Sequence, residues 1–221
     1  MGKLIVIEGL DGSGKATQAK LLAENLKQQG KRVREISFPN YDSPSSALVK
    51  MYLGGEFGAK PGDVNAYAAS TFYAVDRYAS FKKDWQADYA GGVVIADRYT
   101  TSNAIHQCSK LDAGAWNGYL DWLFDLEYGR MGIPTPDLVV YLRVDPEVSQ
   151  GLMARRYGGN EGKKDIHERD LAYLRHCQEA AAFCVDRLGW RVVECCVDGE
   201  MRSIESIQGD IRALVDALCS Y

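Results

Sequence analysis

The sequence has no long apolar run of the kind that exports a chain or anchors it in a membrane. The longest run near the N-terminus, residues 4–7, ends at Glu8. It is far shorter than the h-region of a signal peptide, and shorter still than the roughly 20 apolar residues of a membrane span. Val6 also stands where a myristoylation pattern would need Ser or Thr. We therefore expect no membrane association.

An excess of positive charge is also missing. The chain carries 26 Lys and Arg against 30 Asp and Glu, a formal net charge of -4. Proteins that bind a nucleic-acid polymer depend on a broad basic face, whereas a small pocket for a phosphorylated ligand needs only a few local cations. We therefore expect no nucleic-acid polymer as a partner.

The six cysteines lack the spacing of a metal site. Four of them fall inside apolar patterns of helical or strand period, which is typical of buried thiols. We interpret them as reduced, and reduced thiols are the normal state in the cytoplasm. The cysteines are Cys108, Cys177, Cys184, Cys195, Cys196 and Cys219.

No Ser/Pro/Gly-rich stretch or run of like charges is long enough to be a linker. With 46% hydrophobic and 25% charged residues, the composition is that of an ordinary globular protein. We expect one domain over residues 1–221.

Short apolar runs alternate with longer segments of helical period, which predicts crossover units on a parallel sheet. Two late segments, 174–188 and 204–218, carry apolar stripes typical of packed helices. The fold class is therefore α/β, a three-layer α/β/α arrangement around a five-stranded parallel sheet. The predicted strands are 4–8, 33–37, 93–96, 138–142 and 190–195.

A glycine-rich segment follows the first predicted strand and leads into an amphipathic helix. It has the form of a Walker A motif, in which backbone N–H groups and a lysine surround phosphate oxygens, so we predict a P-loop NTPase that binds ATP. The expected phosphate-binding residues are Gly9, Gly12, Ser13, Gly14, Lys15, Ala16 and Thr17.

One position departs from this motif. Ala16 stands where Ser or Thr would ligate Mg²⁺, and Thr17 is one residue out of phase. Mg²⁺ would then depend on phosphate oxygens, water and a carboxylate, Asp11 or Asp97. A phosphate loop that binds nucleotide without catalysis is the alternative reading.

The third predicted strand runs into Asp97, Arg98 and Tyr99. Ligands in open α/β sheets bind at the carboxyl ends of the strands, so this carboxylate and guanidinium should lie beside the phosphate loop. Taken alone, an Asp-Arg-Tyr sequence could equally be a structural ion pair with a stacked ring.

Five motifs taken together, over nearly the whole chain, resemble the thymidylate kinase family in order and spacing. They are residues 9–17, 38–41, 72–77, 97–103 and the basic loop before Asp165. The resemblance implies an enzyme that transfers the γ-phosphoryl group of ATP to dTMP, with Mg²⁺, as a homodimer. It also implies an acceptor-binding region at about residues 38–82 and a lid at about 153–166.

The resemblance assigns roles in binding dTMP. Phe38 and Tyr41 would contact the acceptor, and Tyr73, rather than Phe72, would stack on the base with a gain of about 1 to 3 kcal/mol. Arg77 would donate to thymine O4, Asn103 would pair with the base edge, and His106 would lie near the sugar. The expected dTMP-binding residues are Asp11, Phe38, Tyr41, Tyr73, Arg77, Arg98, Asn103 and His106.

Phosphoryl transfer to an ionised phosphate needs positioned charge rather than a strong general base. Lys15 would hold the donor phosphates and Arg98 the acceptor phosphate. Asp11 resembles a family carboxylate near the acceptor sugar and the metal, and its other reading is an aspartate that only shapes the loop. A further cation would come from the glycine-rich loop 155–164, where Arg155 and Arg156 are the catalytic candidates; the other reading of this loop is a solvated basic surface.

Two other functions share these features. A deoxynucleoside kinase has the same sheet, phosphate loop and Asp-Arg pair, but its acceptor is a neutral hydroxyl that profits from a carboxylate base. A catalytically silent nucleotide-binding switch protein would explain Ala16.

Overall fold

The computed structural model describes residues 2–157, 167 and 171–219. Its centre is a five-stranded parallel sheet with the strand order β2-β3-β1-β4-β5. All five predicted strands are confirmed to within one residue at either end. Their bounds are β1 Lys3–Glu8, β2 Val33–Ser37, β3 Val93–Asp97, β4 Leu138–Arg143 and β5 Arg191–Glu194.

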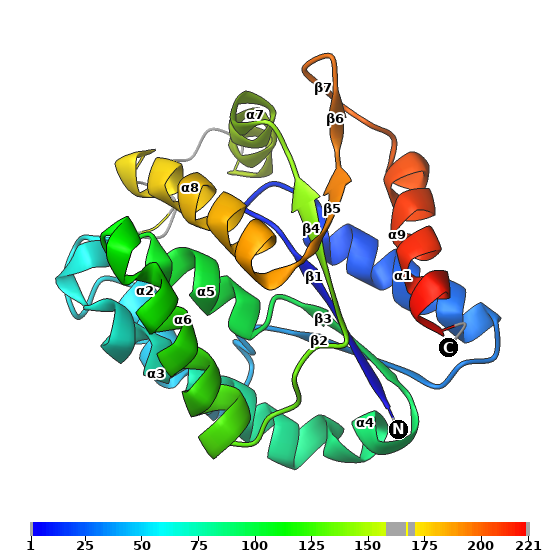
Figure 1. Ribbon diagram of the computed structural model, residues 1–221, viewed down its shortest axis with the longest axis horizontal. Helices are drawn as coiled ribbons and strands as arrows, with labels where there is room; N and C mark the ends of the chain where they lie inside the picture. Colours follow the sequence, from blue (N-terminus) through cyan, green and yellow to red (C-terminus); the bar gives the residue numbers. More distant parts are fainter. Residues whose placement is uncertain (1, 158–166, 168–170, 220–221) are drawn as a thin grey trace.

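Helices cover both faces of the sheet, which confirms the predicted three layers (Figure 1). Helices α1 and α9 lie on one face, and α5 and α8 lie on the other with α3 and α6 outside them. The bounds are α1 Lys15–Gln28, α2 Ala47–Leu53, α3 Ala66–Ser80, α4 Gln86–Gly91, α5 Thr100–Cys108, α6 Trp116–Phe124, α7 Pro146–Tyr157, α8 Leu171–Leu188 and α9 Ile204–Cys219. Two π-helical segments, Phe81–Trp85 and Asp125–Arg130, extend α3 and α6.

Strand β1 is buried on both of its faces. Leu4 and Val6 belong to the core beneath α5 and α8, while Ile5 and Ile7 belong to the core beneath α1 and α9. Successive side chains of a strand point to opposite faces, and a parallel strand between two helical layers therefore reads as a continuous apolar run. Each such side chain stabilises the fold by about 1.5 to 3 kcal/mol.

The apolar stripes of the last two long helices pack as predicted, with one exception. Cys177, Ala181 and Cys184 of α8 are fully buried, and so are Ile207 and Ile211 of α9. Ile204 was predicted to be part of the second stripe, and this is wrong: it is the first residue of α9 and 48% exposed, because it borders a cavity rather than the sheet.

The thiols of Cys108, Cys177, Cys184 and Cys195 are buried and unpaired, as expected for reduced cysteines. A short hairpin after β5 was not predicted. It pairs β6 (Cys196–Val197) with β7 (Glu200–Met201) across the turn Asp198-Gly199. Strands of two residues are too short to leave a periodic pattern in the sequence.

The prediction of a loop at residues 155–164 is wrong at its start. Helix α7 runs from Pro146 to Tyr157, so Arg155 and Arg156 lie at the end of a helix. Proline suits the first turn of a helix and Leu, Met, Ala and Arg favour helix, so the helix continues until the two glycines that follow. The side chains of Arg155 and Arg156 and all of residues 158–166 lie outside the described residues.

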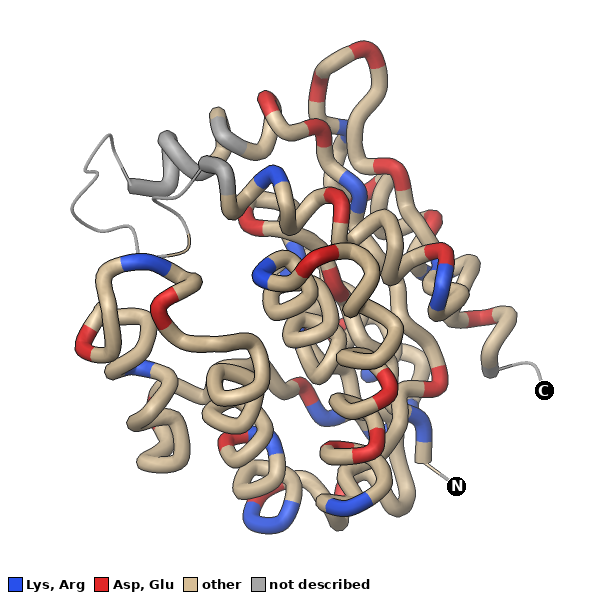
Figure 2. The backbone as a smooth tube through the Cα atoms, turned by 60° about the vertical axis from the view of Figure 1, so that its left-hand side comes forward, with Lys and Arg blue, Asp and Glu red and all other residues tan. Residues whose placement is uncertain are grey.

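None of the helices in the described ranges is long and apolar enough to span a bilayer. Acidic and basic residues are interspersed over the described backbone, without one large basic tract (Figure 2).

Candidate active site

The phosphate loop joins the carboxyl end of β1 to α1. Gly9, Gly12 and Gly14 have φ values of 156°, 80° and 81°, where a residue with a side chain is strained. Gly9 also lies in close contact, because a Cβ there would come within 2.6 Å of Ser13 Oγ and 2.9 Å of the Leu142 carbonyl oxygen. The loop therefore turns tightly enough to direct its N–H groups and the amino end of α1 into the space above the sheet.

Lys15 is the first residue of α1, and its ammonium group folds back over the loop. Its Nζ donates to the Leu10 carbonyl oxygen at 2.8 Å and to Ser13 Oγ at 3.4 Å. Burial and the charge of Arg98 lower the pKa of Lys15 to about 8. Two neutral acceptors therefore hold the ammonium group beside the phosphate loop.

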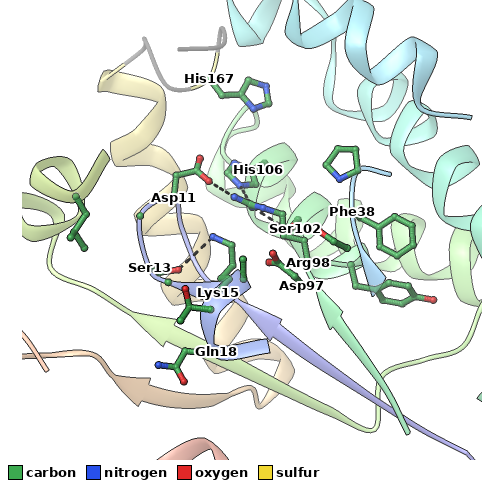
Figure 3. Close-up of a pocket in the computed structure, with 18 of the residues that line it drawn as sticks. Asp11, Ser13, Lys15, Gln18, Phe38, Asp97, Arg98, Ser102, His106 and His167 are labelled. Carbon is green, nitrogen blue, oxygen red and sulfur yellow. Dashed lines mark hydrogen bonds and ion pairs between the residues drawn. The ribbon is translucent and has the colours of Figure 1, made fainter. Parts of the chain in front are cut away.

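Arg98 leaves the end of β3 through a left-handed turn. Its φ is 67°, a conformation that costs an L-residue about 1 to 2 kcal/mol, and its N–H donates to the Ile7 carbonyl oxygen at 3.2 Å. This turn points the guanidinium toward the phosphate loop, where Nη2 pairs with Asp11 (Figure 3). Burial alone would raise the pKa of Asp11, but the charges of Arg98 and Lys15 hold it well below its usual range.

Glu8, the last residue of β1, connects these two loops and was not singled out from the sequence. Its buried carboxylate accepts hydrogen bonds from the Gly9 N–H at 3.0 Å, Thr101 Oγ1 at 2.6 Å and Ser102 Oγ at 2.8 Å, and lies 4.0 Å from Arg98. The start of the phosphate loop and the start of α5 are thereby tied to one group. A glutamate that ends an apolar strand gives no hint of such partners in the sequence.

One cavity of about 720 Å³ contains both charged groups. Lys15 and Arg98 both point into it, so the two predicted phosphate-binding cations share a single site (Figure 3). Gly9 is not among the residues that line the cavity. The other predicted residues with described side chains line the cavity: Asp11, Gly12, Ser13, Gly14, Lys15, Ala16, Thr17, Phe38, Tyr41, Tyr73, Arg77, Asp97, Arg98, Asn103 and His106.

Beyond Arg98, the cavity ends between α3 and α5. Tyr73, Arg77 and Asn103 line this end, and Phe72 instead packs on Tyr52 at a ring distance of 6.3 Å, which confirms its packing role. Gln107, one helical turn after Asn103, was missed by sequence reasoning. It is 1% exposed and lines the cavity, yet neither atom of its amide has a hydrogen-bond partner among the described residues. A buried amide without partners is costly, so this end of the cavity is suited to a polar ligand.

The loop after β2 forms another wall. Phe38 is buried against Tyr99 at a ring distance of 6.0 Å, and Tyr41 is half exposed beside it. Asp76 of α3 holds this loop, since its carboxylate accepts from the Asn40 N–H at 2.8 Å and from Ser45 Oγ at 2.6 Å. The sequence contained Asp76 next to Arg77, but nothing in the pattern showed which segment it would hold.

His106 lies next to Arg98. Its Nε2 is 3.3 Å from Arg98 Nη1, and its ring stacks with those of His167 at 5.9 Å and Tyr173 at 6.2 Å. Burial and the charge of Arg98 lower the pKa of His106 to about 3, and burial lowers that of His167 well below its ordinary value. Both imidazoles are therefore neutral near pH 7.

These buried histidines predict that the protein loses stability in acid. The pKa of His106 is lower in the folded state than in the unfolded chain, so its contribution is complete above about pH 6.5 and is lost as the pH falls toward about 3. Between pH 7.5 and 5, the Tm of His106→Gln should therefore fall less than the Tm of the unmodified protein. Part of the fall should remain, because His167 is still present and its pKa is also lowered by burial.

The matched control is His176→Gln, because His176 is exposed on α8. This variant should keep the full drop in Tm, measured by differential scanning calorimetry. An equal drop in His106→Gln would show that His106 does not titrate on unfolding.

The carboxylates offer one suitable position for a cation. Asp97 Oδ1 is buried, lines the cavity and has no hydrogen-bond partner within the described part of the chain. Burial, only partly offset by Lys15, raises the pKa of Asp97. Asp11 is instead committed to Arg98. No cluster of three or more His, Cys, Asp or Glu residues that could hold a metal by itself occurs among the described residues.

A glycine-rich phosphate loop thus faces an arginine across one cavity, at the carboxyl edge of a five-stranded parallel sheet flanked by helices. This fold and site define a P-loop kinase. The family model for thymidylate kinase matches residues 7–195. The chain belongs to the thymidylate kinase family.

Individual relatives agree with this assignment. The chain is 33% identical to the thymidylate kinase of Mycobacterium tuberculosis over 169 residues, which covers 76% of this chain and 78% of that protein. It is 32% identical to the probable thymidylate kinase of Thermococcus onnurineus over 216 residues, 96% of each chain. The solved structure of Candida albicans thymidylate kinase has a TM-score of 0.71 at 22% identity, covering 98% of this chain and 92% of that one.

The family model and the relatives therefore identify the chain as a kinase. They give no support to the two alternatives, a deoxynucleoside kinase and a catalytically silent switch protein.

Proposed function

We propose that this enzyme transfers the γ-phosphoryl group of ATP to dTMP and so forms dTDP. The observation that carries the proposal is the presence of Lys15 and Arg98 in one cavity of about 720 Å³. Two polyanions can be brought into line there only if each meets its own cation. Membership of the thymidylate kinase family supports dTMP as the acceptor.

The residues around Lys15 take the donor. The N–H groups of residues 12–17 and the amino end of α1 bind the ATP phosphates, and Lys15 neutralises charge on the β and γ phosphates. Arg98 binds the acceptor phosphate, with its guanidinium held by Asp11. The acceptor oxygen is already ionised near neutral pH, so no general base is required. Arg155 and Arg156 are proposed as the further cations that meet the phosphoryl group in transit.

Mg²⁺ would neutralise the donor phosphates. Asp97 is the residue proposed to hold it, directly or through a bound water, because its buried Oδ1 accepts no hydrogen bond from the described residues. Ala16 supplies no oxygen, and Asp11 is engaged by Arg98. The residues around the phosphate loop therefore fit a cation held mainly by phosphate and water.

The thymine base is proposed to lie between α3 and α5. Tyr73 stacks on the ring, Arg77 donates to O4 and the Asn103 amide faces N3–H. Gln107 gives a further amide at the same edge, and His106, Phe38 and Tyr41 surround the sugar and phosphate. Support comes from the fact that all of these side chains line the same cavity as Arg98.

The larger organisation is also proposed. The chain works as one domain, residues 1–221, with the acceptor region at about 38–82 and the lid at about 153–166, in the cytoplasm and as a homodimer. Tyr67, Val75 and Tyr78 on one side of α3 are 42%, 47% and 37% exposed, and this apolar surface is suited to pairing with a second copy.

The test is a panel of acceptors offered with ATP and Mg²⁺ in a coupled assay of ADP release. dTMP should give the highest kcat/KM among dTMP, dUMP, dCMP, dAMP and dGMP, and thymidine should give none, because it lacks the phosphate that Arg98 binds. Preference for thymidine over dTMP would instead indicate a deoxynucleoside kinase. Silence with every acceptor would indicate a binding protein.

A further inference from the structure

Glu127 forms hydrogen bonds with Arg77 and Asn103, the two residues proposed to bind the edge of the base. It lies in the π-helical segment Asp125–Arg130 that extends α6, and it is 0% exposed. Its Oε1 accepts from Arg77 Nη2 at 2.6 Å and Asn103 Nδ2 at 3.3 Å, and its Oε2 accepts from Arg77 Nε at 2.7 Å and Thr100 Oγ1 at 2.8 Å. One carboxylate therefore contacts α3 and α5 from behind the cavity wall.

We infer that Glu127 is a positioning residue that sets the hydrogen-bonding polarity of the base pocket and thereby selects a 4-oxo pyrimidine over a 4-amino pyrimidine. The inference rests on the proposed function, because it takes Arg77 and Asn103 as contacts of the acceptor base. Glu127 itself does not line the cavity.

The Asn103 amide is oriented by its partners. One end of it meets the Ser70 carbonyl oxygen at 3.2 Å and the Glu127 carboxylate at 3.3 Å. Both partners only accept hydrogen bonds, so this end must be the NH₂ group. The amide oxygen then points away from Glu127, where it can accept N3–H of a thymine. The unprotonated N3 of a cytosine would meet this oxygen lone pair to lone pair.

Arg77 forms a bidentate salt bridge with the Glu127 carboxylate. A guanidinium has five N–H donors and no acceptor, and Arg77 uses three of them on Glu127 and the Tyr99 carbonyl oxygen. The remaining two make no hydrogen bond with the described residues. Burial disfavours the charged form, but the Glu127 carboxylate outweighs it and raises the pKa of Arg77. Arg77 can therefore only donate, which suits O4 of thymine and opposes the 4-amino group of cytosine.

A carboxylate is the side chain that imposes both orientations together, because it accepts on both of its oxygens. A glutamine of the same shape would present one acceptor and one donor. In either position its NH₂ group would face an N–H group of Arg77, and at the Oε1 position it would also face the NH₂ group of Asn103. Only the Ser70 carbonyl oxygen would then hold the Asn103 amide, so such a pocket would discriminate less against N3 of cytosine.

The experiment compares dTMP and dCMP as acceptors for Glu127→Gln. We expect the ratio of kcat/KM for dTMP over dCMP to fall at least tenfold, since a site that loses a matched donor or acceptor loses discrimination of that order or more. KM for dTMP should rise and dCMP turnover should increase, while KM for ATP stays within about twofold of the unmodified enzyme. The charge-matched control is Glu35→Gln, an exposed residue of β2 paired with Lys27, which should leave the ratio unchanged.

Glu127→Asp separates polarity from packing and remains informative if the glutamine variant does not fold. It keeps an acceptor-only group but is one methylene shorter, so KM for dTMP should rise at least threefold while the dTMP/dCMP ratio is retained. The inference is overturned if Glu127→Gln loses activity on both acceptors in parallel, or if Glu127→Asp loses the ratio or leaves KM unchanged. Failure of the proposed function is a different result, because the unmodified enzyme would then not phosphorylate dTMP.

Discussion

Replacing Arg98 with alanine should lower kcat for dTMP phosphorylation by about 10³-fold, within the range reported for removing an arginine that meets phosphoryl charge. The guanidinium is fixed by Asp11, His106 and the left-handed turn of its own backbone, so it meets an incoming phosphate without further ordering. A positioned charge of this kind lowers the barrier more than a mobile one does, because it needs no reorganisation during transfer.

The donor site should survive this change. Lys15 keeps its contacts with Leu10 and Ser13, so the Kd for ATP, measured by calorimetry, should stay within about threefold of the unmodified enzyme. Arg32→Ala is the matched control, because Arg32 is an exposed arginine paired with Asp88 on the surface and should leave kcat unchanged. An Arg98→Ala enzyme with normal turnover would remove Arg98 from the reaction.

Lys15→Met should have a comparable effect on the donor side, with kcat/KM for ATP lower by about 10³-fold. Methionine has nearly the same length and packs where the lysine stem packs, but it brings no charge to the β and γ phosphates. Lys20→Met is the control from the same helix, since Lys20 is solvent-exposed and forms a long surface pair with Glu24.

The pH profile gives a second readout of Lys15. The pKa of Lys15 is about 8 in the free enzyme, so kcat/KM for ATP should fall as the pH rises above 8 and the ammonium group loses its proton. Bound phosphates favour the charged form, so kcat at saturating ATP should fall less. A Lys15→Met enzyme should not show this decrease in kcat/KM above pH 8. If the decrease persists, it is caused by the titration of another group.

Several parts of the fold were predictable because they depend on local patterns. Burial leaves a periodic pattern in the sequence, as in the apolar runs of β1 and β4 and the apolar stripe of α8. A loop that surrounds phosphate requires glycines at fixed positions, as at Gly9, Gly12 and Gly14 before Lys15. The errors fell at segment ends, where α7 continues to Tyr157 and Ile204 faces the cavity. The ends of helices and strands depend on the neighbouring elements rather than on the periodic pattern of apolar residues.

The partners of buried polar groups were not predictable in this way. Glu127 and Arg77 are 50 positions apart, and Glu8 and Thr101 are 93 positions apart, yet each pair forms close hydrogen bonds. From sequence alone, a glutamate is expected to be a solvated surface charge. Only when it is buried must its carboxylate have hydrogen-bond partners within the protein. Gln107 shows the converse case, because its amide becomes notable only once it is seen to have no hydrogen-bond partner among the described residues.

The sequence by itself determined the layered α/β sheet, the phosphate loop and the arginine after the third strand, because glycine geometry and apolar period act between residues close together in the chain. The tertiary structure alone decided that Glu127 contacts Arg77 and Asn103, and that Glu8 contacts both the phosphate loop and the start of α5. Those relations arise where distant segments exclude water from the same polar groups, and no local pattern records which segments will meet.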